Sequence, residues 1–144
     1  MEGRIQMKQL SLLWAALFIL LIGIVHADVT ITGDSINFEA DYSQFDDKDN
    51  EDFITETVSL TVSNTNAQNE SVTVSLTGLP NGYTVNNNDK QVTIEANNTE
   101  NVDFTVQVPH SEDSGNKTIG TAKITQGDTE LSSKSLVQNT LSMF

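Results

Sequence analysis

Apolar and polar residues alternate along much of the chain after residue 27. Residues 57–63 show this alternation clearly, and residues 72–76 repeat it. The apolar positions of the two segments are Val58, Leu60, Val62, Val72, Val74 and Leu76, and the residues between them are serines and threonines. Successive side chains of a β-strand point to opposite faces, so a period of two predicts strands with one apolar and one polar face.

The segment between these two strands, residues 64–70, is polar and rich in asparagine. It is too short to contain a crossover helix, and it is suited to an antiparallel hairpin that joins the two strands directly. A hairpin with one apolar face is at best marginally stable in water. The apolar face is therefore expected to pack against a second sheet.

Alternating or β-prone segments recur over the rest of the chain, and no helical period appears beyond residue 27. The further strand segments are residues 29–31, 36–42, 83–85, 92–96, 102–108, 119–124 and 131–137, and the strand that contains residues 57–63 is expected to start near Phe53. Short strands separated by turn signals about every 8 to 12 residues are typical of sandwiches. We therefore predict an all-β fold, an immunoglobulin-like Greek-key β-sandwich of seven to nine strands, preceded by an N-terminal hydrophobic signal helix.

Glycine and proline mark specific turns. Pro80 is expected at the second position of a β-turn that ends a strand, because proline presets the backbone angle required there. Pro109 cannot donate a backbone hydrogen bond, so it predicts a strand end or an edge. Gly120 separates apolar residues of opposite parity, which predicts a β-bulge. Gly127-Asp128 predicts a two-residue hairpin turn.

Residues 1–27 have the pattern of a secretory signal peptide. Arg4 and Lys8 precede an apolar run from Leu10 to Val25, and Val25-His26-Ala27 offers small residues for cleavage before Asp28. The run is shorter than most membrane spans, although retention as an anchor is the alternative. We expect residues 1–27 to be a leader, residues 28–144 to be one exported domain, and the membrane to be contacted only through the leader.

The chain is strongly acidic, with a formal net charge of −13, and contains no cysteine. The leader carries Glu2, Arg4 and Lys8, so its removal would take the charge to −14. Such a field disfavours binding to nucleic acid and to anionic lipid. It fits a solvated outer surface, with a cationic partner or a divalent metal as the alternative. Without cysteine, an exported domain must depend on strand packing for its stability.

One acidic loop is a candidate calcium site. Asp47, Asp49 and Glu51 have the alternate spacing by which a calcium loop supplies its first ligands. The pattern then fails, because Asp52 occupies the glycine position and Val58 the position of the bidentate glutamate. The loop is therefore not an EF-hand, and a solvated acidic loop is favoured over a calcium site. No other cofactor is expected.

Three sequons place Asn69, Asn97 and Asn116 in predicted turns or at their edges. An exported protein can carry glycans at such positions, so the three asparagines are candidate glycosylation sites. Chance matches are common in a chain rich in asparagine, serine and threonine. Intact-mass measurement on native material tests their occupancy.

Catalysis is poorly supported by the residues after the leader. His110 is the only histidine there, and nothing pairs it with a nucleophile. Sugar binding would use exposed aromatic rings, for which only Tyr42 and Tyr83 are suitable polar aromatics. Tyr83 directly follows a turn and is more simply explained as a residue at the edge of the core. We therefore expect no enzyme activity.

Residues 54–126 resemble the immunoglobulin-like domain of the NPCBM-associated, alpha-galactosidase-associated family. The motifs are Asn64 and Asn66 in a turn, Gly78-Leu79-Pro80-x-Gly82-Tyr83, Val102 to Pro109, and Ser114-Gly115 before a final strand. Tyr83 stands where that family usually has a tryptophan. The resemblance implies a non-catalytic spacer or adhesion module appended to extracellular proteins, and it supplies no catalytic residues.

The sequence thus predicts a non-catalytic structural or interaction module of a prokaryotic secreted or cell-surface protein. The expected partner is an unidentified protein or a cell-wall polysaccharide. The alternative is a carbohydrate-associated accessory domain of a longer glycoside hydrolase or adhesin.

Overall fold

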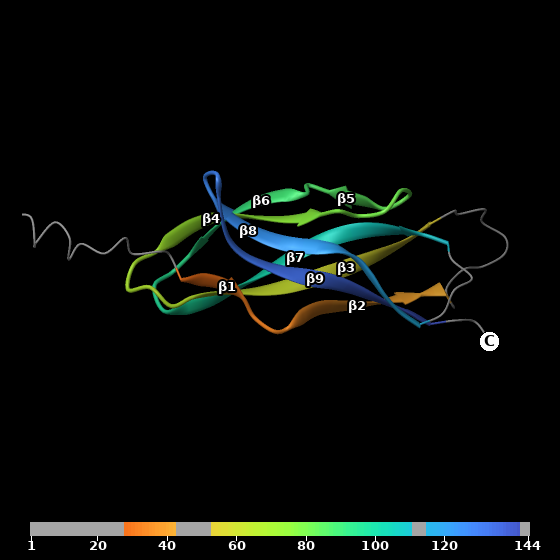
Figure 1. Cartoon of the computed structure of the whole chain (residues 1–144), viewed down its shortest axis with the longest axis horizontal. Coiled ribbons are helices and arrows are strands. Elements are labelled where there is room, and N and C mark those ends of the chain that lie inside the picture. The colour runs from red at the N-terminus through yellow and green to blue at the C-terminus, as the bar shows by residue number, and fades with distance from the viewer. Residues whose placement is uncertain (1–27, 43–52, 111–114, 142–144) are drawn as a thin grey trace, which may run out of the picture.

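The structure, a computed structural model, describes residues 28–42, 53–110 and 115–141. All regular elements in these ranges, apart from a single residue at Tyr42, are β-strands, and they form two sheets that face each other (Figure 1). This confirms the predicted all-β sandwich with nine strands. The expected signal helix and the loop with Asp47, Asp49 and Glu51 lie outside the described residues.

The smaller sheet has four strands in the order β1-β3-β7-β5. Their bounds are Val29–Ile31 for β1, Phe53–Asn64 for β3, Thr84–Asn86 for β5 and Asn98–Pro109 for β7. The larger sheet has five strands in the order β2-β9-β8-β4-β6. Their bounds are Ser35–Asp41 for β2, Glu70–Thr77 for β4, Asp89–Ile94 for β6, Gly115–Gln126 for β8 and Thr129–Leu141 for β9.

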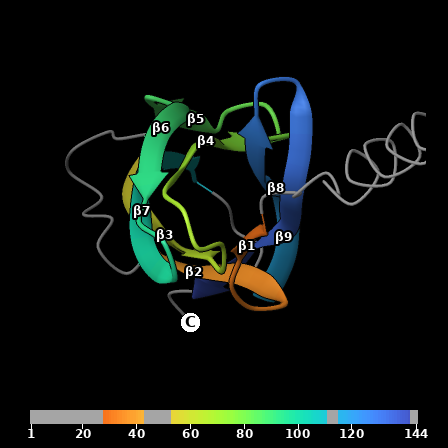
Figure 2. The ribbon, with the colours of Figure 1, turned by 90° about the vertical axis from the view of Figure 1, so that its left-hand side faces the viewer.

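The apolar faces of the two sheets form one continuous core. The view along the long axis shows β3 and β7 on one side of the interior and β8 and β9 on the other (Figure 2). The predicted inward residues of β3 and β4 are all buried, and so are the four alternating apolar residues of β7, Val102, Phe104, Val106 and Val108. At about 25 cal/mol per Å² of apolar surface, burial of this set is the main stabilising contribution in a chain without disulfides.

The predicted hairpin between β3 and β4 is wrong. β3 belongs to the smaller sheet and β4 to the larger one, so residues 65–69 carry the chain from one sheet to the other. Asn64 explains the crossing. Its side chain is 1% exposed, and its Nδ2 donates to the carbonyl oxygens of Gln68, Ile94 and Glu95 at 2.9 to 3.1 Å. The segment is therefore fixed across the end of the core and does not fold back on β3.

The bend after β4 differs by one position from the prediction. The backbone N–H of Tyr83 donates to the carbonyl oxygen of Pro80 at 3.2 Å, so Pro80 is the first residue of this turn and not the second. Asn81 and Gly82 are the central residues, and Gly82 has a φ of +94°, as the third position of a type II turn requires.

The other turn predictions are confirmed. β7 ends at Pro109, the β8–β9 pairing shifts register between Thr118 and Gly120, and Gln126 pairs with Thr129 across the two-residue turn Gly127-Asp128. A second irregularity, between Ile124 and Thr125, had no signal in the sequence. Among the described residues, no helix is long and apolar enough to span a membrane.

The described chain enters and leaves the sandwich at opposite ends of its long axis (Figure 1). The chain passes from β1 in the smaller sheet to β2 in the larger one through a turn at Gly33, which has a φ of +95°. β2 then pairs in parallel with β9 along its whole length, from Ser35 opposite Ser135 to Asp41 opposite Leu141. The first and the last strands of the larger sheet therefore run side by side in the same direction.

Candidate functional site

The two tyrosines lie in one polar cluster at the edge of the core. The hydroxyl of Tyr42 donates to the carbonyl oxygen of Pro109 at 2.8 Å, and the hydroxyl of Tyr83 donates to Oε1 of Gln138 at 2.6 Å. Gln138 is itself buried, and its Nε2 donates to Oγ1 of Thr140 at 2.9 Å. The cluster therefore joins β2, β7, β9 and the turn after β4.

Burial raises the pKa of both tyrosines above the ordinary value of 10.0, and for Tyr42 the charge of Tyr83 adds to this effect. The interaction with Gln138 acts in the opposite direction on the pKa of both hydroxyls. Both phenols are consequently neutral near pH 7 and act as hydrogen-bond donors to the fold.

The sugar-binding alternative loses its aromatic platforms. The side chain of Tyr42 is only 2% exposed, and Tyr83 is half-buried and packs against the core, as the interpretation of Tyr83 as an edge-of-core residue predicted. Stacking on a sugar requires an open ring face. The ring of His110 packs edge-on against Tyr42, with ring centres 5.5 Å apart. His110 thus has a packing contact at the end of β7.

The predicted calcium ligands Asp47, Asp49 and Glu51 lie outside the described residues, so the calcium site stays a prediction. Within the described ranges, no group of three or more histidine, aspartate or glutamate side chains is arranged to hold a metal ion. Calorimetry with calcium, repeated on an Asp47→Ala, Asp49→Ala double variant, tests the loop directly.

The three sequon asparagines are exposed. Asn69 lies in the β3–β4 connection, where its Oδ1 accepts a hydrogen bond from the backbone N–H of Ala96 at 3.0 Å. Asn97 lies in the turn before β7 with a φ of +54°. Asn116 lies near the start of β8 and pairs with Asn139. All three positions are accessible to a modifying enzyme, and glycosylation stays a prediction.

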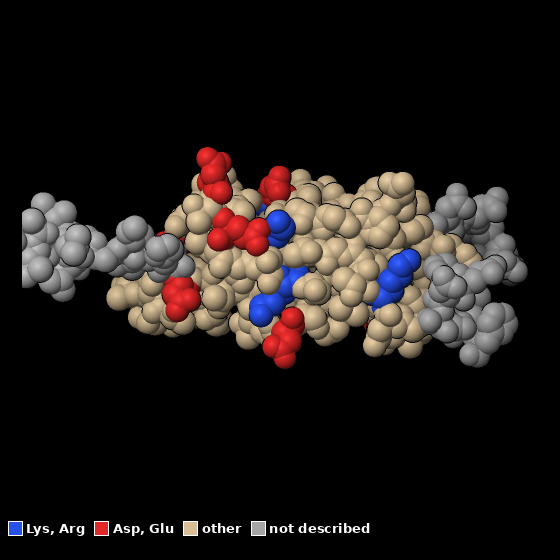
Figure 3. All heavy atoms as spheres, in the orientation of Figure 1, with Lys and Arg blue, Asp and Glu red and all other residues tan. Residues whose placement is uncertain are grey.

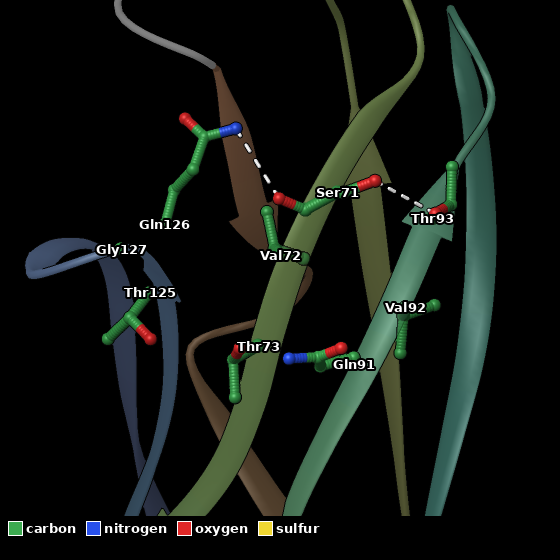
Figure 4. Close-up of a pocket in the computed structure, with 9 residues that line it drawn as sticks. All are labelled: Ser71, Val72, Thr73, Gln91, Val92, Thr93, Thr125, Gln126 and Gly127. Atoms are coloured by element: carbon green, nitrogen blue, oxygen red, sulfur yellow. Dashed lines mark hydrogen bonds between the residues drawn. The ribbon is translucent and has the colours of Figure 1, made fainter.

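A shallow hollow lies where β4, β6 and the end of β8 meet (Figure 4). It has a volume of about 470 Å³ and is lined mainly by serine, threonine and glutamine side chains. Several of these groups bond to one another. The hydroxyls of Ser71 and Thr93 are 2.9 Å apart, and Nε2 of Gln126 donates to Oε2 of Glu70 at 2.9 Å. These bonds engage part of the polar lining, and the lining itself contains no charged side chain.

A second hollow lies between β6 and β7, at the flank where the edges of the two sheets meet. We call it the flank groove, and its volume is about 440 Å³. It is lined by Asn87, Asp89, Lys90, Gln91, Val92, Glu100, Asn101, Val102 and Asp103. Three carboxylates and one ammonium group therefore border an opening between two sheet edges.

Charged side chains are dispersed over the face of the molecule seen in Figure 3. In the view of Figure 3, acidic residues and lysines are interspersed and do not gather in one patch. Among the described residues, the one salt bridge joins Lys123 and Glu130 at 2.9 Å on the exposed β8–β9 surface. That bond lowers the pKa of Glu130. Of the two hollows described above, the flank groove is the one bordered by carboxylates.

Comparison with protein families identifies the family of this two-sheet domain. Residues 30–139 match the sequence model of a family described as "IG-like fold at C-terminal of FixG, putative oxidoreductase". The chain belongs to this FixG C-terminal family. The match confirms the predicted immunoglobulin-like fold, and the oxidoreductase description refers to FixG itself.

Among solved structures, one with a TM-score above 0.5 shares the fold of this chain. The N-terminal domain of PorA matches with a TM-score of 0.51 and 13% identity, over 78% of this chain and 96% of that one. A protein of unknown function from Porphyromonas gingivalis W83 matches with a TM-score of 0.46 and 14% identity, over 81% of this chain and 49% of that one. No curated protein matches the chain.

The resemblance to the NPCBM-associated, alpha-galactosidase-associated family is wrong, because the family that matches residues 30–139 is the FixG C-terminal one. The motif that suggested the resemblance has a local cause. Gly78-Leu79-Pro80-Asn81-Gly82-Tyr83 forms a tight bend closed by the bond from Tyr83 to Pro80. Any sandwich with a strand change at this position favours the same turn residues, so the motif does not identify a family.

Proposed function

We propose that this chain is a non-catalytic structural and interaction module that works outside the cytoplasm. Its membership of an immunoglobulin-like family and the signal-like segment of residues 1–27 support this role. The acidic composition is compatible with a soluble outer surface. The module would hold a partner or a neighbouring domain at a fixed distance from its attachment point.

The arrangement of the two chain ends carries the proposal. The described chain enters the sandwich at one end and leaves it at the other (Figure 1). A domain or partner attached at each end would therefore be separated by the length of the long axis. β9 has 13 residues, which at about 3.3 Å per residue corresponds to roughly 40 Å. A rigid β-sandwich of this length suits a spacer.

The oxidoreductase activity named in the description of FixG is not assigned to this chain. The sequence contains no cysteine, so it supplies no thiolate for an iron–sulfur cluster and no dithiol for disulfide exchange. His110 packs against Tyr42. The cysteine-dependent forms of redox chemistry are therefore not proposed for this chain.

Cell fractionation with N-terminal sequencing tests the exported location. We expect the chain outside the cytoplasm, beginning at Asp28 if the leader is cleaved. A membrane-bound chain beginning at Met1 or Met7 would support the anchor alternative and exclude cleavage. A soluble cytoplasmic chain that retains residues 1–27 would contradict the proposal.

A further inference from the structure

The outer edge of β7 is only partly paired. On one side β7 pairs with β3 along its whole length, from Asn98 opposite Asn64 to Pro109 opposite Phe53. On the other side β5 pairs only with residues 105–107. The part of β7 from Asn98 to Phe104 therefore has no strand beside it on this side among the described residues. An open edge of this kind is a template for another extended chain.

The backbone after β5 explains why the edge is open. Asn87 takes a left-handed conformation with a φ of +53°, and the chain then leaves the smaller sheet and joins β4 as β6. Oδ1 of Asn88 accepts a hydrogen bond from the backbone N–H of Leu76 at 2.9 Å and holds this departure in place. The flank groove is thus the space along which β5 would have continued beside β7.

Lys90 occupies the first open position of this edge. Its Nζ donates to the backbone carbonyl oxygen of Asp103, and it lies 5.2 Å from the ring centre of Phe104. A side-chain ammonium group therefore supplies the bond that the N–H of a neighbouring strand would supply. Lysine at a sheet edge also opposes unspecific strand pairing.

The groove beside the open edge is mainly negatively charged, which favours a cationic partner. Asp89, Glu100 and Asp103 border the flank groove and are exposed, and Lys90 is the one cation in its lining. None of the three carboxylates forms a salt bridge with another described residue. The chain as a whole carries −13, so a second copy would be repelled from this edge, whereas a cationic segment would be attracted.

We propose that the open edge of β7, from Asn98 to Asp103, binds an extended cationic peptide segment of another protein by strand addition. The peptide backbone pairs with β7. Its Lys or Arg side chains face Asp103 in one register and Glu100 in the register shifted by one residue, because these two carboxylates lie on opposite faces of the strand, and Asp89 borders the groove from β6. A peptide N–H replaces Nζ of Lys90 at the carbonyl oxygen of Asp103. This inference rests on the proposed role as an interaction module and adds to it the site and the chemistry of the partner.

The test uses the exported chain and three labelled eight-residue peptides with alternating Lys-Val, Lys-Thr and Arg-Ile, compared with Glu-Val. Fluorescence anisotropy should show binding of the basic peptides only, and amide hydrogen exchange should slow within residues 98–103. The double reversal Glu100→Lys, Asp103→Lys should weaken binding by about ten-fold or more. Lys90→Ala should tighten it several-fold, because the carbonyl of Asp103 becomes free.

A matched control separates the groove from the overall field. Asp34→Lys, Asp128→Lys makes the same change in net charge at two exposed turns away from the groove, and it should change binding by less than about three-fold. Thermal melts establish that every variant is folded.

Three results would overturn the inference. They are the absence of binding of all three basic peptides up to about 1 mM, equal weakening by the groove reversal and its control, and slowed exchange at β1 or β2 in place of β7. None of them would affect the proposed spacer role, which depends on location and on the distance between the chain ends.

Discussion

At the scale of single residues, Asn64 has a structural role that its sequence context does not reveal. The two N–H bonds of its buried amide are shared among three backbone carbonyl oxygens, and its Oδ1 accepts a hydrogen bond from the N–H of Asn66 at 2.9 Å. One side chain thereby joins the β3–β4 connection to the turn between β6 and β7. The sequence places Asn64 in an asparagine-rich turn, and nothing in that composition distinguishes it from the exposed asparagines nearby.

Asn64→Ala should lower the free energy of unfolding by about 2 to 3 kcal/mol, because it leaves buried carbonyl groups without donors. Urea unfolding followed by circular dichroism measures the change. Asn86→Ala, at an exposed position of β5, is the control and should cost less than about 0.5 kcal/mol. Equal effects of the two substitutions would show that the Asn64 bonds contribute no more than a surface side chain.

The two tyrosines make a pH-dependent prediction. Their pKa values are raised in the folded state, so their contribution to stability is fully present below the unfolded pKa of about 10 and is lost as the pH rises through the folded values. Because the chain has two tyrosines and both belong to the cluster, phenolate absorbance reports on the cluster alone.

We expect the absorbance titration of the folded chain to have its midpoint above that of the chain in urea. Tyr83→Phe should remove one of the two shifted transitions and cost about 1 kcal/mol through the lost bond to Gln138. Coincident titrations of the folded and unfolded chain would contradict the buried environment of the cluster.

At the scale of elements, the alternation of apolar residues predicted most strands and their inward faces, because burial of one face is a local property of the pattern. The pattern could not predict which sheet each strand joins. The length and polar composition of the β3–β4 connection predict a hairpin, whereas in the structure the buried bonds of Asn64 hold a connection that crosses between the sheets. The apolar residues before and after Gly120 lie at positions of opposite parity, and this change correctly predicted a β-bulge because a bulge restores the register within one strand.

Gly120 also lies close to the β4–β5 connection. A Cβ atom there would lie 2.7 Å from the carbonyl oxygen of Thr77 and 3.3 Å from Cδ2 of Leu79. Gly120→Ala should therefore destabilise the domain by about 1 to 3 kcal/mol, since backbone atoms must move. Thr118→Ala, at an exposed position before the bulge, should have a smaller effect in the same thermal melts. An unchanged melting temperature for Gly120→Ala would mean that the contact is relaxed in solution.

At the scale of the whole molecule, the fold class was predictable and the family was not. The alternation of apolar residues predicts a β-sandwich, and the acidic charge and the absence of cysteine are compatible with export, but unrelated families share all three features. The candidate groove was also beyond prediction, because it depends on β5 being short and on the chain leaving β7 at Asn87. Neither the length of a strand nor the end of its pairing can be obtained from alternation alone.

The net charge gives a prediction for the whole domain. With a net charge of −13, mutual repulsion of the carboxylates opposes the compact state, and salt screens it. Raising sodium chloride from about 0.01 to about 0.5 M should increase the melting temperature by a few degrees. A control with Asp34→Asn, Asp128→Asn should show a smaller increase, and a fall in melting temperature with salt would contradict dominance of repulsion.

The parallel pairing of β2 with β9 has a mechanical consequence. Tension between the two ends of the domain pulls β2 and β9 in opposite directions along their shared axis, so the hydrogen bonds from Ser35 to Asp41 are loaded in shear. Bonds loaded in this way must yield nearly together, whereas bonds at the end of a hairpin open one after another. A domain with this pairing resists lengthening when its two ends are pulled apart, as the proposed spacer role requires.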